Sequence, residues 1–307
     1  MFQKIYSIFN SNSLNCRLLQ ALILLAIAFI IINIYNQNSR KLEGFRQSDR
    51  YILKEDNQIY DEFYTQIYDD LMLPQNRTKY ELLKIIEMTE PSKDYSVFLD
   101  IGSGTGHTVH YLKQSGYQAH GIDQSKSMVG FSQTKFSDIS VKCGNVKDPI
   151  IFDRSTFTHI LCMGMTIYEI EKKWIFFQNS YFWLQQNGYL IIHLVDREKF
   201  ATIVPAGKPE VLDNPQKYSE NRITDTIVDF IDFKYKSTYD FSKEGQVIHK
   251  ETFTDMNTQH IRENEKTLHM DSIEDILLLA TKYGFLTKGK IELETEGEYI
   301  YIFEKMM

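Results

Sequence analysis

The stretch from Val97 to Gly106 reads Val-Phe-Leu-Asp-Ile-Gly-Ser-Gly-Thr-Gly, a short apolar strand that runs directly into a glycine-rich turn. Glycine at alternate positions lets a backbone turn tightly and approach a ligand closely, and these glycines are Gly102, Gly104 and Gly106. Asp100 lies near the end of the strand, where a buried carboxylate needs a partner. Asp123 ends a second short apolar strand. Together these features predict a pocket for a nucleoside that carries a positive charge.

The spacing of the turn distinguishes between two classes of ligand. A dinucleotide-binding loop has the pattern G-x-G-x-x-G and holds a pyrophosphate at the helix N-terminus. Here the spacing is G-x-G-x-G, and His107 stands where the third glycine of the dinucleotide pattern belongs. A carboxylate such as Asp100 repels a pyrophosphate and attracts an amino-acid ammonium group. The turn therefore favours S-adenosylmethionine over NAD.

The composition is that of an ordinary globular protein. The 307 residues are 43% hydrophobic and 24% charged, with a formal net charge of −7. An acidic chain does not fit binding to a phosphate backbone, which needs clustered Lys and Arg, so no nucleic-acid partner is expected. The cysteines, Cys16, Cys143 and Cys162, lack metal-ligand spacing, so no metal site is expected and a reducing compartment is indicated.

The N-terminal region contains a nearly continuous apolar run, Leu18–Ile34, interrupted only by Gln20 and Asn33. A helix of this length spans about 26 Å, close to the hydrocarbon thickness of a bilayer. We expect an uncleaved transmembrane anchor over residues 18–35, because no cleavage pattern of a signal peptide follows the run. More Lys and Arg residues follow the run than precede it, which places the rest of the chain in the cytoplasm as a single-pass membrane protein.

The remaining chain is predicted to form one domain over residues 50–307, after an N-terminal tail (1–17), the anchor and a linker (36–49). Residues 50–89 are predicted to be helical. Strands then alternate with helices, which indicates a Rossmann-like α/β fold with a seven-stranded doubly wound sheet. Its strands are expected at Val97–Ile101, Ala119–Ile122, Ile139–Cys143, His159–Met163, Tyr189–Val195, Phe285–Glu292 and Glu298–Glu304.

An additional sheet is predicted within this framework, at about residues 223–270. Polar and apolar residues alternate along Thr226–Phe241, and Gln246–Phe253 and Ile261–Met270 behave similarly. Such alternation is typical of strands with one buried face. We expect an antiparallel sheet inserted into the α/β fold.

Several segments resemble the motifs of class I S-adenosylmethionine-dependent methyltransferases. Phe98–Gly106 resembles the first motif and Gly121–Ser125 the second, while Gly144–Val146 stands where the family usually has Gly-Asp-hydrophobic. Thr158–Met163 resembles the fourth-strand motif. The resemblance is strongest to the broad type-11-like group, which contains many enzymes that methylate N or O atoms of small molecules.

The resemblance implies roles for individual residues. The glycine turn would pack against the methionine part of the cofactor, Asp123 would accept hydrogen bonds from both ribose hydroxyls, and Gln124 would cover the adenine. Asn145 would accept from the adenine amino group, and Val146 would donate its backbone N–H. Tyr64 and Tyr68 would form an aromatic lid, although their helical spacing also fits a core position. The predicted cofactor-binding set is Asp100, Gly102, Ser103, Gly104, Gly106, Asp123, Gln124, Asn145, Val146, Met163 and Tyr64.

Methyl transfer depends mainly on proximity and orientation, and a base is needed only for a protonated nucleophile. His193 is the first candidate, because it lies near the end of a strand where ligands of open α/β sheets bind. A hydrogen-bonded structural role for His193 is an equal alternative. Tyr168, the second candidate, and Glu169 follow the fourth strand of the sheet, where they either orient an acceptor or cap a helix.

These features predict a membrane-anchored S-adenosylmethionine-dependent methyltransferase that acts on a small-molecule or lipid-like acceptor. No Asn/Asp-Pro-Pro-Tyr element follows the fourth strand, which disfavours methylation of DNA bases. A tethered S-adenosylmethionine-binding protein without catalysis is the first alternative. An NAD-dependent oxidoreductase is the second.

Overall fold

The computed structural model describes residues 17–18, 21–30, 49–207 and 215–306. The chain divides into two compact units, Met1–Glu43 and Gly44–Met307, which are treated separately. In the first unit, residues 21–30 are helical. Within the described ranges, no helix has both the length and the apolarity needed to cross a membrane, so the predicted transmembrane helix is not found there. The rest of the predicted anchor and nearly all of the predicted linker lie outside the described residues.

The second unit contains the predicted seven-stranded sheet. In sheet order its strands are β11 (Phe285–Glu292), β12 (Glu298–Lys305), β6 (Leu184–Val195), β5 (Phe157–Cys162), β2 (Val97–Ile101), β3 (Gln118–Asp123) and β4 (Val141–Cys143). A short connection joins β12 to β11 as an antiparallel hairpin, and β12 is also antiparallel to β6. After β2 the next strands, β3 and β4, are added towards one edge of the sheet, whereas after β5 the next strand, β6, is added towards the other edge. The boundary between these two strands is therefore a topological switch point, where open α/β sheets bind ligands.

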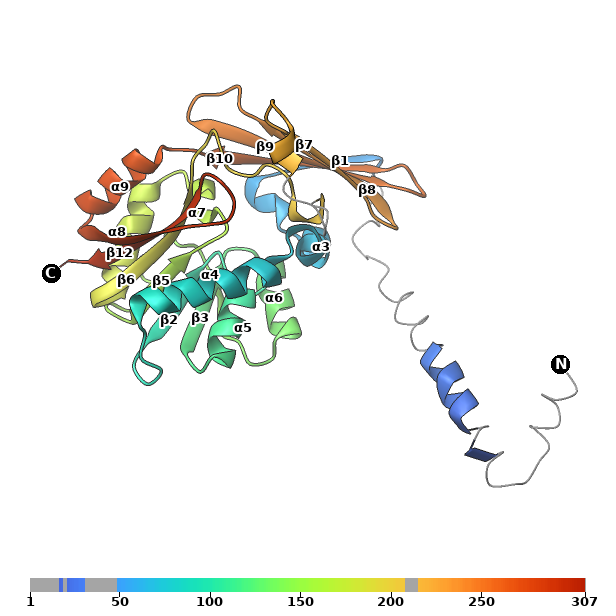
Figure 1. Ribbon diagram of the computed structural model, residues 1–307, viewed down its shortest axis with the longest axis horizontal. Helices are drawn as coiled ribbons and strands as arrows, with labels where there is room; N and C mark the ends of the chain where they lie inside the picture. Colours follow the sequence, from blue (N-terminus) through green and yellow to red (C-terminus); the bar gives the residue numbers. More distant parts are fainter. Residues whose placement is uncertain (1–16, 19–20, 31–48, 208–214, 307) are drawn as a thin grey trace, which may run out of the picture. The chain divides into compact units, whose positions relative to one another are not determined.

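Helices cover both faces of this sheet (Figure 1). One apolar cluster joins Phe98 and Leu161 to the helices α4 (Pro74–Thr89), α5 (His107–Gln114) and α6 (Lys126–Lys135). The second cluster joins Leu99 of β2 and Ile160 of β5 to the helices α8 (Lys173–Trp183) and α9 (Ile273–Lys282). These two residues are the sequence neighbours of Phe98 and Leu161. Because side chains alternate across a strand, strands that are apolar throughout supply two cores.

A second sheet has the strand order β1-β10-β9-β8-β7. The predicted strand Thr226–Phe241 is two strands joined by a turn. The strands are β1 (Tyr51–Glu55), β7 (Asp225–Asp229), β8 (Phe233–Asp240), β9 (Gln246–Asp255) and β10 (Ile261–His269). β7 to β10 are antiparallel neighbours, as predicted, whereas β1 pairs with β10 in parallel.

The prediction of helix throughout residues 50–89 is wrong for β1. This strand has only five residues, in which partly buried and exposed positions alternate. So short a segment does not distinguish strand from helix by periodicity alone. Its pairing partner is about 200 residues away, with Tyr51 opposite Ile261.

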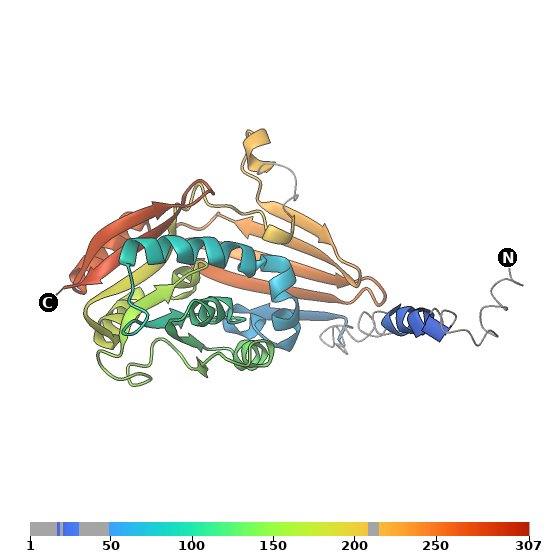
Figure 2. The same ribbon diagram turned by 60° about the horizontal axis from the view of Figure 1, so that its bottom comes forward.

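The second sheet lies beside the carboxyl end of the parallel strands (Figure 2). The short helix α7 (Thr166–Glu169), which follows β5, contacts β10, and so does the 3-10 helix η2 (Asp56–Ile59). Helix α3 (Glu62–Met72) follows η2 and packs on α6. These elements surround the switch point and define the candidate site.

Candidate active site

A pocket opens at the switch point, with about 880 Å³ of empty space including its mouth. Its walls come from the carboxyl ends of β2 and β3, the segment after β4, the segment after β5, and the region of η2 and α3.

The glycine-rich turn forms one wall, as Gly102 and Gly104 both line the pocket. Both have positive φ angles, +70° and +51°, which residues with a side chain rarely adopt. A Cβ atom added to Gly102 would lie 2.6 Å from Cγ2 of Thr166. The turn therefore requires glycine at position 102, both for its backbone and for the close approach of the segment after β5.

Asp123 lies at the end of β3 and lines the pocket. Its Oδ2 accepts a hydrogen bond from the Gly104 N–H at 2.9 Å, and its Oδ1 accepts one from the Ser125 N–H at 2.8 Å. Burial raises the pKa of Asp123, the two backbone N–H groups oppose this rise, and Glu169 adds to it. A carboxylate accepts about four hydrogen bonds. The remaining capacity of Asp123 is enough for the two hydroxyls of a ribose, and this contact stays a prediction.

Gln124, Asn145 and Val146 also line the pocket. The Asn145 side chain donates to Gln124 Oε1 at 3.4 Å and accepts from the Lys147 N–H at 2.9 Å. The Asn145 amide oxygen was expected to accept a hydrogen bond from the adenine, and it already accepts one from the backbone of its own turn. One lone pair of this oxygen is left for a ligand.

Five residues of the predicted cofactor-binding set do not line the pocket: Asp100, Ser103, Gly106, Met163 and Tyr64. Asp100 is 3% exposed, and burial raises its pKa to about 8 despite a hydrogen bond with Thr108. Asp100 lies on the central strand β2, which is buried on both faces, and it is not part of the pocket lining. The attraction between its carboxyl group and an ammonium group stays a prediction.

The aromatic wall of the pocket comes from the neighbours of Tyr64. Tyr60 and Tyr68 line the pocket, whereas Tyr64 is 2% exposed and donates from its hydroxyl to Glu251 at 2.9 Å. The three rings lie in series, with centroid distances of 5.7 and 6.0 Å. The periodic aromatic residues marked the right segment, but sequence alone did not show which rings face the pocket.

Both predicted catalytic residues lie outside the pocket lining. His193 is fully buried, accepts from the Met165 N–H at 3.2 Å and lies 3.3 Å from Glu298. Burial and the neighbouring Arg77 lower its pKa. The Tyr168 hydroxyl is also fully buried, and it accepts from the Val195 N–H at 2.9 Å. Both side chains have structural partners in the interior.

Two charged residues were not in the predicted site. Glu169, at the end of α7, lines the pocket and accepts at Oε1 from the Tyr60 hydroxyl at 2.6 Å and from Lys266 at 3.1 Å. Lys266 lies on β10 of the second sheet. Glu169 was predicted either to orient an acceptor or to cap a helix, but it was not included in the predicted site. Nothing in the sequence marked Lys266 except its position in a predicted strand in which polar and apolar residues alternate.

Asp69 connects α3 to the glycine-rich turn. It accepts hydrogen bonds from the Thr105 hydroxyl at 2.7 Å and from His107 at 3.1 Å, and it also pairs with Lys135 of α6. Burial would raise the pKa of Asp69, but these hydrogen bonds outweigh it and hold the pKa at about 2. Since Tyr68 precedes Asp69, this contact positions the aromatic wall against the turn.

We therefore expect the variant Asp69→Asn to weaken binding of S-adenosylhomocysteine about three- to tenfold, because a charge-assisted hydrogen bond contributes more than a neutral one. Isothermal titration calorimetry measures the change. The matched control is Asp70→Asn, a change of the exposed neighbouring residue. Equal Kd values for the two variants would show that the contact does not position the pocket.

Comparisons with known proteins agree with this fold. Residues 99–192 match the family model described as a methyltransferase domain, type 11. The fold is similar to an S-adenosylmethionine-dependent methyltransferase from Clostridium acetobutylicum, with a TM-score of 0.59, 16% identity, and coverage of 80% of this chain and 98% of that one. A sugar N-methyltransferase from Streptoalloteichus has a TM-score of 0.55 and 14% identity, with coverage of 75% and 87%. An amino pentose methyltransferase from Micromonospora echinaspora has a TM-score of 0.53 and 14% identity, with coverage of 76% and 91%. No protein with a curated function matches the sequence.

Proposed function

Because the chain is a class I S-adenosylmethionine-dependent methyltransferase, we propose that it methylates a nitrogen or oxygen atom of a small molecule. Its cofactor is S-adenosylmethionine. The observation that carries the proposal is the pocket at the switch point, where the glycine turn faces Asp123. Asp123 can accept further hydrogen bonds there, and the backbone of the glycine turn beside it has no side chain that would obstruct a ligand.

The residues around the pocket orient the reactants. Bound S-adenosylmethionine supplies an activated methyl group, and transfer requires its carbon to lie in line with the acceptor lone pair. The glycine turn and Asp123 fix one end of the cofactor. Tyr60 and Tyr68 cover the pocket from the side of η2 and α3, which excludes water from the transfer.

The acceptor would enter from the side of the second sheet. β10 faces this edge of the pocket through Lys266, which pairs with Glu169. The fold of the chain is shared with enzymes described as acting on a sugar and an amino pentose. These likenesses support a small polar acceptor, and a lipid-like acceptor is the second possibility within the same class.

Two ligands test the cofactor assignment. We expect S-adenosylhomocysteine to bind the full chain with a micromolar Kd in calorimetry, and NAD to neither bind nor displace it. Displacement of S-adenosylhomocysteine by NAD would favour an oxidoreductase. Binding of S-adenosylhomocysteine without product from any small-molecule fraction would favour a cofactor-binding protein without catalysis.

Membrane attachment through residues 18–35, with the catalytic domain in the cytoplasm, is a further part of the proposal. The support is the apolarity of this run, together with the helix at residues 21–30, whose large apolar side chains such as Leu24, Leu25 and Phe29 are exposed. Fractionation of cells that express the full chain or a chain without residues 1–45 tests it. Recovery of both chains in the supernatant would contradict the attachment.

A further inference from the structure

The carboxylate of Glu169 has one engaged oxygen and one free oxygen. Both of its hydrogen bonds, from the Tyr60 hydroxyl and from Lys266, go to Oε1. Across the described residues no hydrogen bond reaches Oε2. The side chain is 27% exposed and lines the pocket. Glu169 thus presents a free carboxylate oxygen in the pocket while its partners fix the orientation of the group.

A free carboxylate oxygen determines which kind of ligand group can bind to it. An ionised carboxylate only accepts hydrogen bonds, so its partner has to be a donor. Bonds to cationic donors are shorter and about twice as strong as neutral ones. Asp123 lines the same pocket and adds a second carboxylate; burial raises the pKa of Asp123, and the charge of Glu169 adds to this rise. Both carboxylates favour a cation in this part of the pocket.

We propose that Glu169 binds the ammonium group of an amine acceptor through Oε2 and takes a proton from it. This inference rests on the proposed function, which it narrows from N or O acceptors to amines.

The groups that face Glu169 from the surrounding elements are compatible with this role. Tyr60 and Tyr68 remain neutral, because burial and then Glu169 raise the pKa values of both phenols. His249 of β9 is also neutral at pH 7, since burial lowers its pKa to about 4. In the described part of the chain, Lys266 is the cation that pairs with Glu169, and it occupies Oε1. Oε2 is left for the acceptor.

The chemical step balances in atoms and charge. An ammonium ion has no lone pair, so it must lose a proton before it attacks carbon. Glu169 takes this proton and becomes a neutral acid, while the acceptor becomes a free amine. The nitrogen lone pair forms the new N–C bond as the C–S bond breaks, and the electrons of that bond go to sulfur. The products are a methylated ammonium ion and neutral S-adenosylhomocysteine, and Glu169 returns its proton to water.

The first test asks whether the acceptor is an amine. A small-molecule cell extract is incubated with the protein and methyl-labelled S-adenosylmethionine. A second portion is first treated with acetic anhydride and then with mild alkali, so that amines are acetylated while hydroxyls are restored. We expect labelled product in the first portion and none in the second. Labelled product in both portions would overturn the proposal and leave the methyltransferase assignment intact.

The second test uses Glu169→Gln, with Glu171→Gln as the matched control because Glu171 is an exposed acidic residue on the same segment. With the purified fraction, we expect Glu169→Gln to lower kcat/KM by about 100-fold, the size of a general-base effect. The deficit should shrink as pH rises, since more of the acceptor then arrives as free amine. The Kd of S-adenosylhomocysteine should stay within about threefold of wild type.

Three outcomes would contradict the role of Glu169. A kcat/KM close to that of Glu171→Gln would exclude it from the reaction. A tenfold or larger rise in the Kd of S-adenosylhomocysteine would assign Glu169 to the cofactor instead. Absence of both S-adenosylhomocysteine binding and methyl transfer in the wild-type chain would overturn the proposed function itself, and this inference with it.

Discussion

Replacement of Asp123 by Ala is expected to abolish cofactor binding. The carboxylate would form two charge-assisted hydrogen bonds to the ribose, each contributing about 1.5–3 kcal/mol, so their loss corresponds to at least a 100-fold rise in Kd. The change also removes the acceptors of the Gly104 and Ser125 N–H groups, so the glycine turn loses its hydrogen bond to this side chain and keeps its backbone hydrogen bonds to the Ile122 carbonyl of β3. Calorimetry with S-adenosylhomocysteine measures the effect.

The control for this variant is Asp94→Ala, which changes an exposed aspartate in the turn before β2. Far-ultraviolet circular dichroism establishes that both variants are folded. Asp123→Asn adds a finer comparison, because its amide keeps one acceptor oxygen without the charge, and it should bind with intermediate affinity. Wild-type affinity in folded Asp123→Ala would exclude the pocket as the cofactor site.

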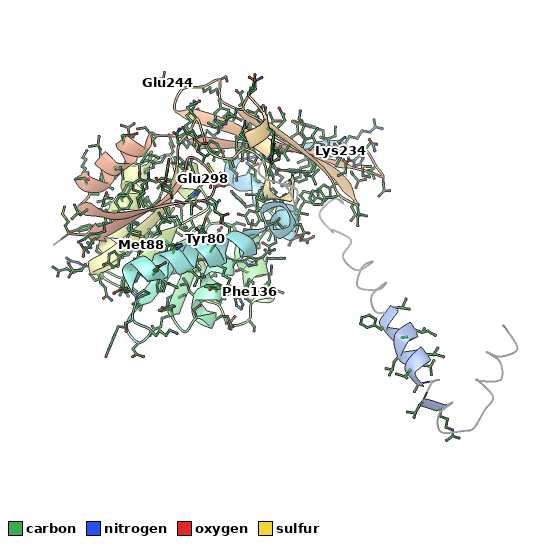
Figure 3. The ribbon with its side chains drawn as sticks, in the orientation of Figure 1. Tyr80, Met88, Phe136, Lys234, Glu244 and Glu298 are labelled. Atoms are coloured by element: carbon green, nitrogen blue, oxygen red, sulfur yellow. The ribbon has the colours of Figure 1, made fainter. Side chains whose placement is uncertain are left out.

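The largest loss of stability is expected for Glu298→Gln. Glu298 begins β12 at the end of the seven-stranded sheet that faces the second sheet (Figure 3). It is 7% exposed, and its carboxylate lies 3.3 Å from both His193 and Arg77. Breaking a buried ion pair from one side costs about 3–5 kcal/mol. Because the Arg77 side chain is 41% exposed and also pairs with Glu81, we expect a smaller loss of about 1–3 kcal/mol in the free energy of unfolding.

The pH dependence of stability gives this prediction a second readout. Burial would raise the pKa of Glu298, but its bond to His193 and the charge of Arg77 lower it to about 2. A carboxylate with a lowered pKa stabilises the fold fully above the pKa of the unfolded chain, near 4.5, and loses this contribution as pH falls towards 2. The free energy of unfolding should therefore fall more steeply between pH 5 and 2 in wild type than in Glu298→Gln.

Glu304→Gln is the matched control for Glu298, because Glu304 lies on the same strand but is partly exposed and pairs with Lys288 at 2.7 Å. Exposed pairs contribute about 0–1 kcal/mol. Chemical denaturation of the two variants compares them directly. Equal losses would show that the cluster of Glu298, His193 and Arg77 has no special role in stability.

The seven-stranded sheet was predictable because its strands carry strong local signals. β2 was predicted with its observed bounds, since an apolar run that ends at glycine leaves little choice of boundary. The two halves of Thr226–Phe241 were merged, because one alternating pattern continues through the turn between β7 and β8. β1 was missed because its partner strand is about 200 residues away.

The candidate site was predictable only where it lies within one motif. The glycine turn and Asp123 lie close in sequence, and both line the pocket. The cluster of Tyr60, Glu169 and Lys266 joins segments separated by up to 206 residues, so no local spacing marks it. His193 was correctly placed near the end of a strand, but its side chain is bound to Glu298 in the interior. The sequence predicts where a strand ends, whereas the packing of the fold determines which side chains there remain available to a ligand.

Stoichiometric methyl transfer by the wild-type chain tests the proposed activity directly. The protein is incubated with methyl-labelled S-adenosylmethionine and a fractionated small-molecule extract, and both products are quantified by mass spectrometry. We expect labelled acceptor and S-adenosylhomocysteine in equal amounts, and neither product with Asp123→Ala. Unchanged S-adenosylmethionine in every fraction, with a folded wild-type protein that binds S-adenosylhomocysteine, would contradict the proposed activity.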